Sequence, residues 1–441
     1  MTDLSYLPAR RLADRIKRRD LTATEALQTY LDRIAKHNPA LNAVVSLNAD
    51  RAFDAALAAD ATAAPTGALH GVPMTLKDAH DVAGLRTTIG TEVFDRMPST
   101  DGTVAARLRA AGAIIVGHSN VPPFLADYRS ENPIFGRTTN PWDAERTPGG
   151  SSGGATAALA AGLTPVEVGS DLAGSLRLPP HFCGVYGLKA TENRIPTTGF
   201  FRPPDGLPPS VRILGSLGPL ARDLADLELV LRIISGPDPT DPDVPPVPLP
   251  RRRHRPLSEL RLAVAPALPG ATVAESLRGQ VERVAAAASD AGAAVESRLP
   301  DVDWGEQAVF GALMEAVTSV FAPDTEPRTL AWYVEHLHRR DTFAGAWERF
   351  FTGYDALILP PAATTAFRHD TADVGSQGHS MIFANLAGLP ALTVPAGFDA
   401  DGLPVGVQIV GPRWSEIRLI EVAAALEAAA ILPGCSPPPG F

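Results

Sequence analysis

Serines in two small-residue segments are the residues of this sequence best suited to chemistry. Residues 147–154 read TPGGSSGG, with Ser151 and Ser152 among four glycines. Ser175 lies in a second segment, residues 169–191, GSDLAGSLRLPPHFCGVYGLKAT. A serine that follows small residues can expose its hydroxyl, and adjacent backbone amides can converge where an oxyanion would form. A serine alone is a weak nucleophile, so these segments require a base elsewhere in the chain.

Histidine is the first base to consider. His80, His118 and His181 lie near these segments in the sequence, but none of them has a recognisable triad context. No serine has the GxSxG context of a nucleophile elbow, because Ser151 is surrounded by GGSSGG and Ser175 lacks the second glycine. The sequence therefore does not predict a Ser–His–Asp triad.

Lysine is the other available base. Among the four lysines we single out Lys77, because we expect it alone to follow an apolar run, in GVPMTLKDAHDVAG, and so to be buried. Burial lowers the pKa of a lysine from about 10.4, and a neutral lysine can act as a general base in Ser–Lys variants of the triad. One serine of the TPGGSSGG loop could then relay a proton between Ser175 and Lys77. The simpler alternative for a lone buried lysine is an ion pair with a neighbour such as Asp78.

The elements around these residues alternate between helices and short apolar runs. Thr22-Ala-Thr-Glu25 is a capping box before apolar residues at helical spacing, and Asn48 can cap a following helix. Seven prolines between residues 236 and 250 predict a surface linker or crossover, after which the pattern resumes. This alternation predicts an α/β fold. The expected helices are 48–64, 103–111, 155–161, 273–291 and 415–429, with a helical region over 303–349; the expected strands are 72–76, 113–116, 260–265 and two runs within 391–410.

Composition excludes several classes of protein. A net charge of −10 over 441 residues argues against broad binding of a phosphate backbone. Two cysteines rule out a disulfide framework and a cysteine zinc site, and the ten histidines show no metal-binding spacing. The first residues have no secretory apolar region, and no apolar stretch reaches membrane-spanning length. We therefore expect a cytoplasmic protein with no metal, no membrane contact and no nucleic acid partner.

The segments GVPMTLKD, TPGGSSGG and GSDLAGSLRLPPHFCGVYGLKAT together resemble the amidase signature family, and the similarity covers nearly the whole chain. The resemblance implies that Ser175 is the nucleophile, at the family's spacing from the double-serine loop. It also implies that Lys77 is the base and that Ser151 bridges the two, after a cis peptide bond from Gly150.

The same resemblance implies an oxyanion hole of backbone N–H groups from Leu172, Ala173, Gly174 and Ser175. The common family motif has glycine where Ala173 stands. A methyl group leaves the N–H in place, but it would disturb the loop if this residue needed a positive φ. Ser152 is expected to support the loop. Asp171 and Arg177 are expected to form a structural charge pair or anchor the loop, and direct substrate contact is the alternative.

The resemblance further implies one large α/β domain over residues 1–441, with a mixed twisted β-sheet core flanked by helices on both faces. Its signature-bearing core would span about 65–235, followed by a proline-rich crossover at 236–257 and a variable substrate-pocket region at about 300–385. Leu125, Ala126 and Asp127 correspond to a stretch that lines the acyl pocket, so they are candidates for substrate contact, and helix packing is the alternative for each. No cofactor is expected, and a homodimer is one expected assembly.

The leading functional hypothesis is an amidase that cleaves a small-molecule carboxylic amide to an acid and an amine. An acyltransferase with the same acyl-enzyme and an amine acceptor is a close alternative, because the sequence does not show which acceptor reaches the pocket. A third hypothesis is the ammonia-supplying component of a tRNA-dependent amidotransferase. A catalytically inactive binding protein of the same fold is the alternative from a different class, and intact Lys77, Ser151 and Ser175 argue against it.

Overall fold

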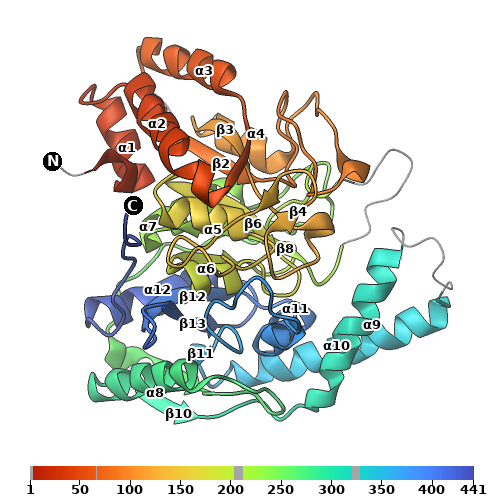
Figure 1. Cartoon of the computed structure of the whole chain (residues 1–441). Helices are drawn as coiled ribbons and strands as arrows, with labels where there is room; N and C mark the ends of the chain where they lie inside the picture. The colour runs from red at the N-terminus through yellow and green to blue at the C-terminus, as the bar shows by residue number, and fades with distance from the viewer. Residues whose placement is uncertain (1–2, 66, 203–211, 320–327) are drawn as a thin grey trace.

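A mixed β-sheet of eight strands forms the centre of the computed structural model, which describes residues 3–65, 67–202, 212–319 and 328–441 (Figure 1). Its strands are β6 Val166–Asp171, β7 Tyr186–Lys189, β8 Ser216–Ala221, β9 Arg261–Val264, β10 Ala294–Ser297, β11 Ala356–Leu359, β12 Ala391–Phe398 and β13 Pro404–Val410. They lie in the order β10-β9-β11-β13-β12-β7-β8-β6. The first three are parallel, and the other neighbours pair antiparallel. The predicted mixed sheet is confirmed.

The helices begin largely where the sequence predicts. Thr22 and Glu25 form the predicted capping box, with the Glu25 amide donating to Thr22 Oγ1 at 3.0 Å and the Thr22 amide donating to Glu25 at 2.8 Å. Asn48 caps the next helix through the Arg51 amide. The α-helices are α1 Ala9–Lys17, α2 Ala23–Leu41, α3 Ala49–Ala61, α4 Thr103–Ala110, α5 Gly153–Ala160, α6 Leu178–Cys183, α7 Leu224–Ile234, α8 Glu275–Asp290, α9 Gln307–Thr318, α10 Leu330–Phe350, α11 Ile382–Leu386 and α12 Glu416–Ala428.

Helices cover both faces of the large sheet. Successive side chains of a strand point to opposite faces, and here they pack into different apolar clusters, each formed with different helices. In β9, Leu262 and Val264 pack with α7, α8 and α12, whereas Ala263 packs with α9, α10 and α11. In β8, Leu220 packs against α5. Figure 1 shows α9 and α10 projecting on one side of the molecule, away from α7 and α12.

A second sheet of three strands lies beside β6 and carries Lys77. Its strands are β1 Val44–Leu47, β2 Pro73–Lys77 and β3 Ile114–Ser119, in the order β1-β3-β2. Every residue of β2 is buried. The Thr75 amide donates to the Thr164 hydroxyl at 3.2 Å, and the Thr75 hydroxyl donates to Glu167 on β6 at 2.6 Å. The edge strand β2 of the small sheet is therefore held against the edge strand β6 of the large sheet.

Two regions are not single continuous helices or strands. The proline-rich residues 236–256 form neither a helix nor a named strand, as their prolines predict. The expected helical region over 303–349 consists of a 3-10 turn, η5 (Trp304–Glu306), followed by α9 and α10, and its residues 320–327 lie outside the described part of the chain.

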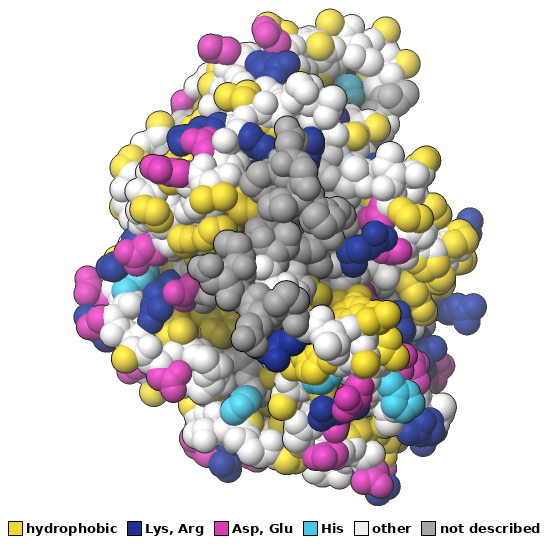
Figure 2. Space-filling view, turned by 90° about the vertical axis from the view of Figure 1, so that its right-hand side faces the viewer, with side chains coloured by type: hydrophobic (Ala, Val, Ile, Leu, Met, Phe, Trp, Pro, Cys, Tyr) yellow, Lys and Arg dark blue, Asp and Glu magenta, His cyan; other side chains and the backbone are white. Residues whose placement is uncertain are grey.

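The molecular surface shows no single dominant charge on the face drawn in Figure 2, where acidic and basic side chains are interspersed around hydrophobic ones. None of the helices that the structure describes combines the length and hydropathy needed to span a bilayer.

Candidate active site

Lys77 ends β2 with its side chain fully buried among hydroxyl groups. Its Nζ lies 2.7 Å from Ser151 Oγ, 2.9 Å from Ser152 Oγ and 3.0 Å from Ser170 Oγ. Burial lowers the pKa of Lys77 to about 7, although the negative charges of nearby Asp171 and Glu167 act in the opposite direction. An amine in this environment can gain and lose a proton near neutral pH.

Ser151 connects Lys77 to Ser175. Ser151 Oγ lies 3.0 Å from Ser175 Oγ, so a continuous line of hydrogen bonds runs from the lysine through one serine to the other. The peptide bond between Gly150 and Ser151 is cis, as the resemblance implied. A Cβ atom on Gly150 would lie 2.4 Å from the Asp127 carbonyl oxygen, which explains the glycine there. The three residues predicted to act together are therefore in contact.

The nucleophile loop, residues 172–177, connects β6 to α6 and holds Ser175 at 7 % exposure. The amides of Leu172, Ala173 and Ser175 donate to no acceptor in the part of the chain that the structure describes. The Gly174 amide, in contrast, donates to Asp171 Oδ1 at 2.8 Å. Of the amides predicted for the oxyanion hole, Gly174 alone already has an acceptor among the described residues.

Gly174, not Ala173, has the conformation that requires glycine. Its φ is 120°, and a Cβ atom there would lie 2.4 Å from the Met381 sulfur. Ala173 has no positive φ, so its methyl group introduces no backbone strain. The departure from the common family motif is accommodated.

Asp171 anchors the nucleophile loop from the end of β6. Its carboxylate accepts hydrogen bonds from the Gly174 and Leu176 amides at 2.8 and 3.0 Å, and from Arg177 Nε and Nη2 at 2.9 Å each. Asn385 on α11 adds a fifth hydrogen bond at 3.0 Å. Burial would raise the pKa of Asp171, but Arg177 and the other donors hold it below its ordinary range. The predicted charge pair of Asp171 and Arg177 is confirmed.

The histidines take no part in this arrangement. His181 Nδ1 accepts from the Gly406 amide at 2.8 Å, and His118 Nδ1 lies 3.0 Å from the Arg86 carbonyl oxygen. Burial lowers the pKa of His181 to about 4 and that of His80 to about 3. Among the described contacts, none of these rings hydrogen-bonds a serine of the site, in agreement with the sequence analysis.

The burial expected of Lys77 is confirmed, but Lys77 is not the only buried lysine among the described residues. Lys189 ends the interior strand β7, and it too is fully buried with its pKa lowered to about 7 by burial. Its Nζ donates to the carbonyl oxygens of Leu389 at 2.7 Å and Ala190 at 3.3 Å. Contact with hydroxyl groups, rather than burial, therefore distinguishes Lys77.

Leu125, Ala126 and Asp127 lie beside the serine loop, at and after the short turn η3 (Pro123–Leu125). Leu125 packs against a small apolar cluster, and Ala126 is exposed. The Asp127 carboxylate, 40 % exposed, accepts from the Arg129 amide at 2.9 Å and pairs with its guanidinium at 3.2 Å. Their contact with a substrate stays a prediction.

Sequence reasoning missed Ser170, which contacts Lys77, as well as Asn385 and Glu167. Asn385 reaches Asp171 from more than 200 residues away and carries no local motif. Glu167 is fully buried and accepts hydrogen bonds from Thr75 at 2.6 Å and from the Val168 amide at 3.1 Å. Burial raises the pKa of Glu167 to about 7. A charged residue inside the apolar run VEV was the available signal for Glu167. Among the described residues, no cluster of His, Cys, Asp and Glu could hold a metal ion.

Comparisons with known proteins identify the family of the chain. The family model "Amidase" matches residues 25–331 and 324–420. The chain is 33% identical over 479 residues to a glutamyl-tRNA(Gln) amidotransferase subunit of Moorella thermoacetica, covering 96% of this chain and 97% of that one. A solved 6-aminohexanoate cyclic dimer hydrolase with substrate bound has a TM-score of 0.85 and 27% identity, covering 100% and 99% of the two chains. A chain from a vestigial protein complex linked to the origins of an s-triazine catabolic enzyme has a TM-score of 0.86 and 25% identity, covering 97% and 99%. The protein therefore belongs to the amidase signature family of enzymes.

Proposed function

We propose that this amidase cleaves a small carboxylic amide to a carboxylate and an amine or ammonia through an acyl-enzyme on Ser175. The observation that carries the proposal is the unbroken line from Lys77 Nζ to Ser151 Oγ at 2.7 Å and on to Ser175 Oγ at 3.0 Å. A serine nucleophile needs a base in reach, and a lysine with a pKa of about 7 can supply one near neutral pH.

In the first half-reaction Lys77 is neutral. The Ser175 hydroxyl gives its proton to Ser151 Oγ while Ser151 gives its own proton to Lys77 Nζ, and Ser175 Oγ bonds to the amide carbonyl carbon. When the resulting tetrahedral intermediate collapses, the carbon–nitrogen bond breaks. Ser151 protonates the leaving nitrogen and recovers a proton from Lys77. The acyl group is then an ester on Ser175.

In the second half-reaction water takes the place of the amine. Lys77 accepts the proton of water through Ser151, the water oxygen attacks the ester carbon, and Ser175 leaves with a proton returned along the same route. The base is thus regenerated and the carboxylic acid is released.

The oxyanion would be stabilised by the amides of the nucleophile loop. Leu172, Ala173 and Ser175 have amides without another acceptor among the described residues, so they are the strongest candidates. Gly174, which donates to Asp171, would contribute only if its hydrogen bond were shared. Losing one such donor typically lowers the rate by roughly 10²- to 10³-fold.

Leu125, Ala126 and Asp127 are proposed to border the substrate. The Asp127 carbonyl oxygen lies against Gly150, the residue before the bridging serine, which supports this position.

The test is a panel of primary, aryl and peptide-like amides, assayed with the wild type and with Ser175→Ala. We expect turnover by the wild type only, and covalent labelling of Ser175 by a fluorophosphonate. Equal labelling of Ser175→Ala would show that the nucleophile is wrong. Repeating the assay with a competing amine distinguishes hydrolysis from acyl transfer, because a transferase forms the new amide in preference to the acid.

A second candidate is one component of a multi-subunit amidotransferase, which the 33% identity to such a protein over 96% of the chain favours. In that case the chain would act together with partner proteins, and a homodimer would not be its working assembly. Turnover of simple amides by the isolated chain, with a kcat unaffected by added tRNA, would argue against this candidate.

A further inference from the structure

A hollow of about 410 Å³ is lined by residues of three separate segments, 269–271, 304–311 and 379–382. One wall is the start of α9 with the preceding η5, and the opposite wall is the segment 379–382, where η7 (Gly375–Ser380) leads into α11. Its volume falls within the range of about 300–1,000 Å³ that is usual for small-molecule sites. Most of its lining residues belong to the predicted substrate-pocket region at about 300–385.

Met381 links this hollow to the catalytic loop. His379 and Ile382, which flank it closely in the chain, line the hollow, while its own sulfur would lie 2.4 Å from a Cβ atom placed on Gly174. Arg177 Nη1 donates to the Met381 carbonyl oxygen at 2.7 Å. The segment that lines one side of the hollow therefore also contacts the nucleophile loop through Met381.

The hollow is lined by apolar and aromatic surface. Trp304, Phe310 and Ile382 belong to, or pack on, the apolar cluster that Leu172 and Ala173 also touch. None of the described residues that line it is an aspartate, glutamate, lysine or arginine. A charged group entering it would lose hydration without meeting an opposite charge, so the lining favours a neutral occupant.

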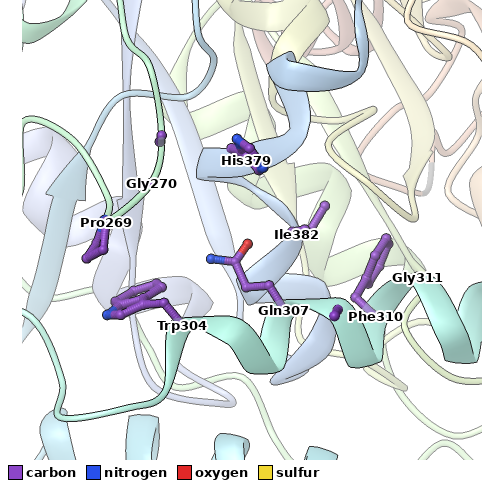
Figure 3. A pocket seen from close by; sticks show the side chains of 10 residues that line it. Pro269, Gly270, Trp304, Gln307, Phe310, Gly311, His379 and Ile382 are labelled. Carbon is purple, nitrogen blue, oxygen red and sulfur yellow. The ribbon is translucent and has the colours of Figure 1, made fainter.

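Besides His379, Gln307 gives the hollow a polar side chain. Its side chain extends from α9 into the space between Trp304 and Ile382 (Figure 3). Gln307 Oε1 is buried and accepts no hydrogen bond from any residue that the structure describes. The Gln307 side chain would have to turn for this oxygen to face the hollow, where a ligand that brings a donor would give it the partner it lacks.

We propose that this hollow, bounded by Trp304, Gln307, Phe310 and Ile382, receives the non-reacting part of the amide substrate. That part is a neutral aromatic group, and an N–H or O–H on it donates to Gln307. The proposal rests on the proposed function for the identity of the substrate as an amide. It names the class of amide that the enzyme selects, and it excludes zwitterionic amides as preferred substrates.

The first experiment compares kcat/KM for acetanilide, benzamide, propionamide and glutamine. The wild type should favour at least one of the two aromatic amides over propionamide by roughly ten- to a hundredfold, the effect of burying one ring, and should disfavour glutamine. Ile382→Trp, which fills the hollow, should lower that ratio roughly tenfold or more. Val334→Trp adds the same side chain at an exposed position of α10 and should leave the ratio unchanged. A ratio unaffected by Ile382→Trp, or a preference for glutamine, would overturn the proposal.

The second experiment separates this proposal from the catalytic one. In a Ser175→Ala background, calorimetry should show binding of the preferred aromatic amide, and Ile382→Trp should abolish it. At least one hydroxylated derivative of that amide should bind more tightly than the amide itself. In Gln307→Leu this derivative should bind no more tightly than the parent amide. If the wild type turned over no amide but this binding occurred, the proposed function would fail and the pocket would stand. Absent binding, or binding insensitive to Ile382→Trp, would overturn the pocket whatever the activity.

Discussion

Replacing Glu167 with glutamine tests how charge around Lys77 sets the pH at which the enzyme becomes active. Glu167 is buried on β6 and hydrogen-bonded to Thr75, which precedes Lys77 by two residues on β2. Side chains two residues apart on a strand share a face about 7 Å apart. The glutamine can keep both contacts, because its oxygen can accept from the Val168 amide while the Thr75 hydroxyl turns to accept from its nitrogen.

The direction of the effect follows from the sign of the lost charge. A negative Glu167 stabilises the ammonium form of Lys77 and raises its pKa, whereas burial lowers that pKa to about 7. We take the spacing of Thr75 and Lys77, about 7 Å, as the separation between the Glu167 carboxylate and the ammonium; at an effective dielectric constant of 20, a charge at that separation contributes about 2 kcal/mol. Near neutral pH Glu167 is itself partly protonated, because burial raises its pKa to about 7. We therefore expect Glu167→Gln to lower the pKa of Lys77 by about one unit.

The assay is the pH profile of kcat/KM, which reports the base of the free enzyme. Activity should rise with pH through the pKa of Lys77, and in Glu167→Gln this acidic limb should move to lower pH. Glu421→Gln is the control, because it removes a nearly buried carboxylate of α12 that accepts from the Arg253 amide and is not among the charges that shift the pKa of Lys77. An acidic limb that stayed in place, or moved to higher pH, while the variant unfolded at the wild-type temperature would refute the assignment of Lys77 as the titrating base.

Three further substitutions test the site. Ser151→Ala should lower kcat by roughly 10²- to 10⁴-fold, because it interrupts proton transfer; a kcat within a few-fold of the wild type would exclude the relay. Asn385→Leu removes a buried hydrogen bond from Asp171 and should lower the free energy of unfolding by about 1–3 kcal/mol, measured by urea denaturation. It should lower kcat more than it raises KM, because the lost hydrogen bonds hold the nucleophile loop through Asp171 and Arg177, and an effect on KM alone would contradict this. Gly174→Ala forces a side chain into a φ of 120° and against Met381, so fluorophosphonate labelling should slow markedly; an unchanged labelling rate would show that the loop tolerates a Cβ atom.

The sequence predicted those helices whose starts are marked by nearby capping residues. The capping box at Thr22 and the cap at Asn48 mark helix starts because the side chain that satisfies the backbone lies within three residues. β8 has no such signal: SLGPLA contains glycine and proline, both of which are unfavourable in an interior strand. Its position between β7 and β6 depends on partners that are remote in the sequence.

The residues of the site also fall into those that a local motif predicts and those whose role depends on distant parts of the chain. Lys77, Ser151 and Ser175 were predicted through a resemblance between motifs, and the structure places them in contact. Burial itself was a poor guide, since Lys189 is as buried as Lys77 and differs only in facing carbonyl groups. Asn385 could not be found, because its role exists only after α11 packs against the end of β6.

The catalytic residues come from two sheets, so the site is complete only while these sheets are packed against each other. Lys77 belongs to the three-stranded sheet, and Ser175 follows an edge strand of the eight-stranded sheet. If the small sheet separated from β6, every strand and helix could persist while the nucleophile lost its base. The reactivity of Ser175 therefore reports whether the three-stranded sheet is packed against β6. It would fall when this interface loosens, before any measure of secondary structure changes.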